Sequence, residues 1–212
     1  MCWNESVSLN TFLFSSFALL LIIYNNSFTK YKIKELNSKW IYVFFASFIL
    51  MQLAEFFIWR NINNKYYNNL FSIFAVSLLI VQPLASIMII QTIFIRNILL
   101  FIYLLLAIPF SIYQFSTQNI YTTVTKKGHL DWVFFDNSPL ILLIWFSFLF
   151  FSLIYEKIWS LIIFAIITLI ICFIKYKYKA GSVWCWIINS LMIYYITYLL
   201  IFLPFIEKMQ IC

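Results

Sequence analysis

Four residues of this sequence carry side chains that enzymes and metal sites commonly use: Cys2, His129, Asp131 and Cys185. Thiolates, imidazoles and carboxylates serve as zinc ligands and as acid/base groups, so a mixed metal site or a small acid/base centre is chemically open to them. His129 is the only histidine, which excludes sites that need two or three imidazoles. A simpler interpretation is that His129 and Asp131 hydrogen-bond within a surface loop. These residues do not indicate a particular cofactor.

Cys2 has chemistry of its own because it follows the initiator methionine. Removal of that methionine would leave a free α-amine beside the thiol, an arrangement in which a residue acts as its own base. A buried thiol and an acylation site are the alternatives. The cysteines, at positions 2, 172, 185 and 212, show no CxxC spacing, so they predict neither a zinc ribbon nor a defined disulfide framework.

A second set of polar residues lies inside long apolar runs. Gln52, Glu55 and Trp59 are spaced i, i+3 and i+7, which places them on one stripe of a helix. A carboxylate inside an apolar helix is costly unless it is paired, protonated or faces a polar interior. The stripe therefore indicates either an ion or substrate path, or a glutamate that reaches to the surface or pairs with Arg60.

A proline gives the third apolar run a similar feature. Pro83 removes the helical hydrogen bond to the carbonyl of Leu79, so Gln82-Pro83 predicts a polar break near the middle of the membrane. Such breaks occur where irregular backbone lines a cavity, and the alternative is a kink stitched by helix–helix hydrogen bonds. The last apolar run also places polar residues on one face, namely Ser182, Cys185 and Asn189.

The composition decides which elements must position these residues. Of 212 residues, 65% are hydrophobic and only 10% charged, with mean hydropathy +0.96. A soluble domain would carry charge on about a quarter of its residues, so lipid must cover this surface. With only two glycines there is no GxxxG seam, and the helices must pack through aromatics and small Ser, Ala or Thr notches.

The apolar runs predict an all-α transmembrane bundle of about seven helices in a single domain, residues 1–212. A spanning helix needs roughly 17–25 apolar residues, and seven runs have such lengths: 7–24, 40–59, 70–90, 97–115, 139–155, 159–175 and 182–203. A tight turn at Glu156-Lys157 separates the fifth and sixth runs, so a six-helix alternative treats one of them as re-entrant. Residues 116–138 form the longest extramembrane loop.

The net charge of +7 comes from basic loops beside the predicted spans. Short basic loops of this kind set topology and contact anionic lipid head groups, so we expect a lipid bilayer as partner and no nucleic acid; a homo-oligomer stays open. The flanks of the first run favour an N-terminus outside the cytosol. The main clusters are Lys30, Lys32, Lys34 and Lys39, and Lys175, Lys177 and Lys179.

Seven spans also fix which loops share a membrane face. The N-terminus, the loop after the second span, the loop 116–138 and the loop before the seventh span must lie on one side, so Cys2, Glu55, His129 and Cys185 converge there. Outside the cytosol, we expect a Cys2–Cys185 disulfide. A cytosolic face would instead favour a thiol pair or a metal site with His129, and two unrelated buried cysteines are the remaining alternative.

Five short motifs occur in order along nearly the whole chain: Met1-Cys2-Trp3-Asn4, Gln52-x-x-Glu55-x-x-x-Trp59, Gln82-Pro83, Gly128-His129-Leu130 and Trp184-Cys185-Trp186. Together they resemble an uncharacterised family of bacterial and giant-virus membrane proteins. Its members open Met-Cys-Phe-Ser and carry Gln-x-x-Glu-Gly-x-x-Trp, Gly-His-Ile and Trp-Cys-Phe-Phe elements. This sequence departs at Trp3, Asn4 and Phe56. The resemblance implies a multi-pass fold and no particular activity.

Three function hypotheses follow. The first is a small channel or transporter whose polar path is lined by five residues: Gln52, Glu55, Trp59, Gln82 and Asn189. The second is a membrane enzyme or redox protein that uses Cys2 and Cys185 with His129 and Asp131. The third is a non-catalytic membrane scaffold. A microbial rhodopsin is excluded because the last apolar run contains no lysine for a Schiff base.

Overall fold

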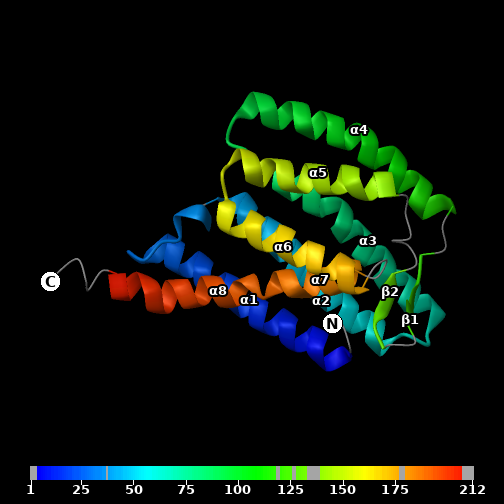
Figure 1. Ribbon diagram of the computed structural model, residues 1–212. Helices are drawn as coiled ribbons and strands as arrows, with labels where there is room; N and C mark the ends of the chain where they lie inside the picture. Colours follow the sequence, from blue (N-terminus) through cyan, green and yellow to red (C-terminus); the bar gives the residue numbers. More distant parts are fainter. Residues whose placement is uncertain are drawn as a thin grey trace.

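The computed structural model describes residues 4–36, 38–117, 120–125, 128–132, 139–176 and 180–206. These residues form a helical bundle in which consecutive spans run in opposite directions, with a small β-hairpin at one end (Figure 1). The predicted all-α, seven-helix class is confirmed. The long helices are α1 (Glu5–Phe28), α2 (Lys39–Arg60), α3 (Lys65–Ile87), α4 (Ile93–Thr117), α5 (Pro139–Tyr155) and α6 (Trp159–Tyr176). The last span is divided into α7 (Ala180–Asn189), α8 (Leu191–Thr197) and a π-helical turn η4 (Tyr198–Phe202).

Within the described residues, six helices are long and apolar enough to cross a membrane, and α5 is a shorter apolar helix. Its 17 residues reach about 25 Å at 1.5 Å per residue, close to the ~30 Å of a bilayer's hydrocarbon core. Ser86 of α3 donates to the carbonyl of Leu149 in α5, and the two helices run side by side in the same direction. This arrangement favours seven spans over the six-helix alternative. The protein is therefore a multi-pass integral membrane protein.

Polar side chains mark where the first three helices begin. Asn4 accepts from the N–H of Val7 at 2.9 Å, and Ser38 and Asn64 cap α2 and α3 in the same way. These caps satisfy N–H groups that have no partner within the helix. The Asn64 cap starts α3 at Lys65, five residues before the predicted span, and α3 ends at Ile87. The Gln82-Pro83 pair falls in the last third of α3, and its place near mid-membrane stays a prediction.

The core is built on α2, which packs against α1, α3 and α7. Aromatic rings fill the contacts of the last span: the ring of Trp184 lies 5.9 Å from that of Phe48 on α2 and 5.6 Å from that of Phe146 on α5. The Trp184 indole also donates to the carbonyl of Ala165 in α6. Aromatic packing thus takes the place of a glycine seam, as the composition predicts. By contrast, α4 lies at the edge and buries little of its surface.

One end of the bundle, here called the N-terminal face, gathers the start of α1, the α2–α3 turn, the hairpin and the start of α7 (Figure 1). The hairpin pairs β1 (Thr122–Val124) with β2 (Leu130–Trp132) in antiparallel register. Arg60 at the end of α2 forms an ion pair with Glu5 at 3.9 Å. The seven-span parity therefore predicts correctly which loops share this face. The other end, called the opposite face, holds residues 29–36, 88–92 and 156–158.

Candidate functional site

The most unusual group in the bundle is a carboxyl enclosed by protein. Glu55 is 0% exposed, as is Gln52 one turn earlier on α2, and Gln52 Nε2 donates to Glu55 Oε2 at 3.0 Å. Since α2 ends at Arg60, Glu55 lies about 7.5 Å inside the helix end. Its complete burial excludes a side chain that reaches to the surface, and the ion pair of Arg60 is made with Glu5 instead. Trp59, on the same stripe, is half-buried.

Glu55 lies on α2, which packs against α7 of the last span. Cys185 on α7 is 1% exposed. A buried carboxylate is expensive in a low-dielectric interior unless a proton or a cation neutralises it. The position therefore suits a group that binds and releases a small positive charge.

One turn beyond Cys185, the α-helix of the last span is interrupted at a single residue, Ser190, whose backbone keeps a right-handed helical conformation. The α-helix ends at Asn189 and resumes at Leu191. The Asn189 amide donates to the carbonyl of Cys185 at 2.8 Å and to that of Phe48 on α2 at 3.3 Å. Asn189 lies nine residues into the span, about 13 Å from its start. The sequence analysis predicted Asn189 as a residue that lines a polar path. It did not predict the interruption beside it, because no proline or glycine stands there.

A third polar group lies toward the opposite face and was missed by the sequence analysis. The Tyr195 hydroxyl on α8 lies 3.2 Å from Ser160 Oγ on α6, and Ser160 donates to the carboxylate of Glu35. Tyr195 is buried, whereas Glu35 is exposed in the turn η1 (Lys34–Leu36). The usable signal is that Glu35 is the only acidic residue in an otherwise basic loop.

These three groups follow one another along the contact between α2 and the last span. Measured along α7 and α8, Asn189 is about 13 Å and Tyr195 about 22 Å from the start of the span, and Glu55 lies about 7.5 Å inside the end of α2 on the N-terminal face. We call this set the interior polar line. Its members are Gln52, Glu55, Asn189, Tyr195, Ser160 and Glu35.

Gln82 does not join Glu55. It is fully buried on α3 but lies five residues before that helix ends, about 7.5 Å from the opposite face. No group among the described residues hydrogen-bonds its side-chain amide. The two glutamines predicted to line one path, Gln52 and Gln82, therefore sit at different depths.

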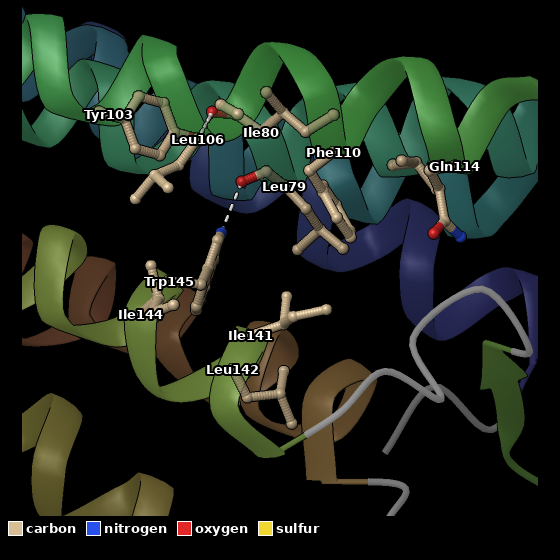
Figure 2. A pocket seen from close by; sticks show the side chains of 12 residues that line it. Leu79, Ile80, Tyr103, Leu106, Phe110, Gln114, Ile141, Leu142, Ile144 and Trp145 are labelled. Carbon is tan, nitrogen blue, oxygen red and sulfur yellow. Dashed lines mark hydrogen bonds between the residues drawn. The ribbon is translucent and has the colours of Figure 1, made fainter.

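Side chains of neighbouring helices hydrogen-bond the α3 backbone at the polar break made by Pro83. The indole of Trp145 on α5 donates to the freed carbonyl of Leu79 at 2.7 Å (Figure 2). The hydroxyl of Tyr103 on α4 donates to the next carbonyl, that of Ile80. Of the two interpretations of this proline, the structure matches the kink held by helix–helix hydrogen bonds.

The residues predicted for an enzyme site are only partly described. Cys2 lies outside the described residues, so the predicted Cys2–Cys185 pair stays a prediction. Its premise that the first and last spans are neighbours is met, because the Trp186 indole on α7 donates to Thr11 Oγ1 on α1 at 3.0 Å. In the described part of the chain, Cys185 is a free thiol.

The hairpin holds the other two candidates. The His129 ring packs edge-on against Tyr176 at 5.7 Å, and Asp131 is half-buried on β2, opposite Thr123. Across the described residues, no three His, Cys, Asp or Glu side chains lie close enough together to hold a metal ion. The described geometry therefore assembles no metal centre from Cys185, His129 and Asp131.

Two buried asparagines, also missed by the sequence analysis, anchor the loops on the two faces. Asn26 donates to the carbonyls of Ile33 and Leu36 and accepts from the N–H of Ile33. Asn68 pairs with both backbone groups of Thr122, so its amide acts as a neighbouring strand would. The signal for both is an asparagine in the last or first turn of an apolar helix.

Compared with protein-family models, curated proteins and solved structures, the chain finds no match in any of the three. The family resemblance drawn from the five motifs stays a prediction. The interior polar line is therefore the feature of the molecule that indicates a function.

Proposed function

We propose that this protein is a small membrane transporter or channel that moves protons, with Glu55 as the group that binds and releases them. The observation that carries the proposal is the burial of Glu55: the carboxyl is 0% exposed inside the bundle and hydrogen-bonded by Gln52. Ionisable residues in membrane spans are rare and mark ion pathways and proton relays. If Glu55 had only a structural role, an apolar side chain of similar size would fill the same space without the free-energy cost of burying a carboxyl.

The closed interior favours protons over larger ions. Gln52 and Glu55 are fully buried, and Asn189 and Tyr195 nearly so; a hydrated cation would need a continuous aqueous opening at each of these points. A proton needs only a succession of groups that accept and donate hydrogen bonds. The carboxyl of Glu55, the hydroxyls of Tyr195 and Ser160 and the carboxylate of Glu35 are such groups.

The break in the last span supports the same proposal. In many transporters, the binding site lies near the bilayer midplane beside discontinuous helices, and one part of the bundle moves relative to another around it. Here α7 ends at Asn189, beside the contact with Phe48 on α2. Movement of α7 relative to α8 would open the route between Glu55 and Tyr195, which the closed packing interrupts.

Proton flux in proteoliposomes tests the proposal. Vesicles that contain a trapped pH-sensitive dye and a potassium gradient are given valinomycin, and the internal pH is followed. The wild-type protein should acidify or alkalinise the lumen faster than empty vesicles. Glu55→Gln keeps the size and the hydrogen-bonding capacity but removes the titratable group, and should lower flux roughly tenfold or more.

Glu5→Gln is the matched control because it makes the same chemical change on the same face, at a side chain that is 45% exposed. Its flux should equal that of the wild type. Equal flux from wild type and Glu55→Gln would contradict the proposal. Flux at the level of empty vesicles from every variant, with all of them folded by gel filtration, would also contradict it and would favour a scaffold.

A further inference from the structure

An apolar groove separates α4 from α3 and α5 on the N-terminal side of the bundle (Figure 2). It encloses about 220 Å³. Its walls are Leu79 and Ile80 of α3, Leu106 and Phe110 of α4, and Ile141 and Trp145 of α5. Leu106 is 45% exposed, so the groove opens onto the lipid-facing surface. This site is separate from the interior polar line.

The groove is closed at its inner end. There the ring of Tyr103 on α4 lies 5.2 Å from that of Phe148 on α5, and the Tyr103 hydroxyl is bound to the carbonyl of Ile80. These contacts hold α4 against its neighbours near the middle of its length. From there the groove extends along α4 to Gln114.

The length and polarity of the groove match one lipid chain. The part of α4 that lines the groove runs from Tyr103 to Gln114. These eleven residue steps span about 16 Å along the helix axis, close to the ~15 Å thickness of the hydrocarbon of one leaflet. The lining is apolar along this length apart from the Tyr103 hydroxyl at the closed end, the Trp145 indole, which is already bound to Leu79, and the amide of Gln114. Gln114 lies three residues before α4 ends, at the depth of glycerol esters.

We propose that the groove binds one acyl chain of a membrane phospholipid, with the chain end at Tyr103 and the ester region beside Gln114. Water would find no partners along apolar walls, and a buried void in a bilayer is filled by the surrounding hydrocarbon. The phospholipids of the adjoining leaflet present such chains at this opening. The second chain of the same lipid stays in the bilayer.

Photolabelling of the full-length protein tests this inference. The protein is reconstituted in phosphatidylcholine nanodiscs that contain a small fraction of phosphatidylcholine with a diazirine in one acyl chain, and the labelled peptides are mapped by mass spectrometry. Labelling should concentrate on residues 106–114 and 141–145. Leu106→Trp fills the groove and should reduce labelling of 141–145 to less than about half.

Leu105→Trp is the matched control, since Leu105 is the adjacent residue of α4, is 62% exposed and does not line the groove. Its labelling of 141–145 should equal that of the wild type. Phe110→Ala widens the groove and should increase labelling, which keeps the test decisive if Leu106→Trp does not fold.

Three results would overturn the inference. The first is equal labelling of 141–145 in the wild type and in all folded variants, which would mean ordinary surface lipid. The second is groove labelling by a free diazirine fatty acid but not by the phospholipid. The third is cross-linking of the groove to a second copy of the chain in place of lipid.

Discussion

Single amide side chains hold the connecting segments of this protein in place. Asn26, in the last turns of α1, is 5% exposed and binds the backbone of Ile33 and Leu36 as well as the hydroxyl of Tyr42. A segment at the membrane boundary has few neighbours of its own, so its buried backbone groups need partners from a helix. One asparagine supplies several of them at once.

We predict that Asn26→Ala destabilises the protein by about 1–3 kcal/mol, because it leaves buried backbone groups of residues 33–36 without partners. The measurement is the thermal unfolding midpoint in detergent, followed by near-ultraviolet circular dichroism. Asn25→Ala is the control, since the Asn25 side chain donates to the carbonyl of Leu21 in its own helix and accepts from the hydroxyl of the adjoining Thr29, and so holds no backbone group of residues 33–36. A midpoint for Asn26→Ala equal to that of Asn25→Ala would contradict the prediction.

At the scale of elements, the bundle compensates locally for irregular backbone. Pro83 frees the carbonyl of Leu79, and Trp145 from α5 takes it as an acceptor. Asn68 of α3 similarly hydrogen-bonds both backbone groups of Thr122 and so attaches the hairpin to α3. In each case a side chain of one element satisfies a main-chain group of another, which ties neighbouring elements together.

A double-mutant cycle tests the Pro83–Trp145 relation. Trp145→Phe should destabilise the protein by about 1 kcal/mol or more through the lost hydrogen bond. Pro83→Ala restores an N–H that returns the Leu79 carbonyl to its helical bond. In that background, Trp145→Phe should therefore cost measurably less than it does in the wild type.

Both steps are read from the midpoint of unfolding in a denaturing detergent. Coupling near zero between the two substitutions would show that the indole contributes through packing alone. Trp145→Phe retains most of the apolar contact, so the cycle isolates the donor.

At the scale of the whole molecule, the alternation of helices determines which residues share a membrane face. An ion pair between Glu5 and Arg60 joins α1 to α2 on the N-terminal face. On the opposite face, the N–H of Gln91 donates to Glu156. Contacts of this kind require an even number of membrane crossings between the residues that they join, as the seven-span arrangement gives.

Accessibility to a membrane-impermeant maleimide checks this topology in sealed vesicles. Cys2 and Cys212 are replaced by serine, and the buried Cys172 and Cys185 are kept. Single cysteines at Asn63 and Thr123 should then react from the same side, and those at Lys32 and Gln91 from the other. A cysteine at Thr123 that reacts from the side opposite to Asn63 would contradict the seven-span arrangement.

The sequence by itself determined the environment and limited the number of spans to six or seven. Apolar runs of spanning length with little charge allow only a helical bundle in lipid, because no other structure of this chain satisfies its backbone there. Once the spans are counted, parity decides which loops share a face. The cost of a carboxyl in an apolar run also singled out Glu55 before any tertiary contact was known.

Only the tertiary structure decided which buried polar groups meet. Helical spacing places Gln52 beside Glu55, but the depth of Gln82 depends on where α3 begins, which the Asn64 cap controls. The line from Glu55 to Tyr195 and Glu35 joins α2, α6, α8 and the turn η1, so no local pattern contains it. The groove at α4 arises in the same way, because it is a space between three helices that each look continuous in sequence.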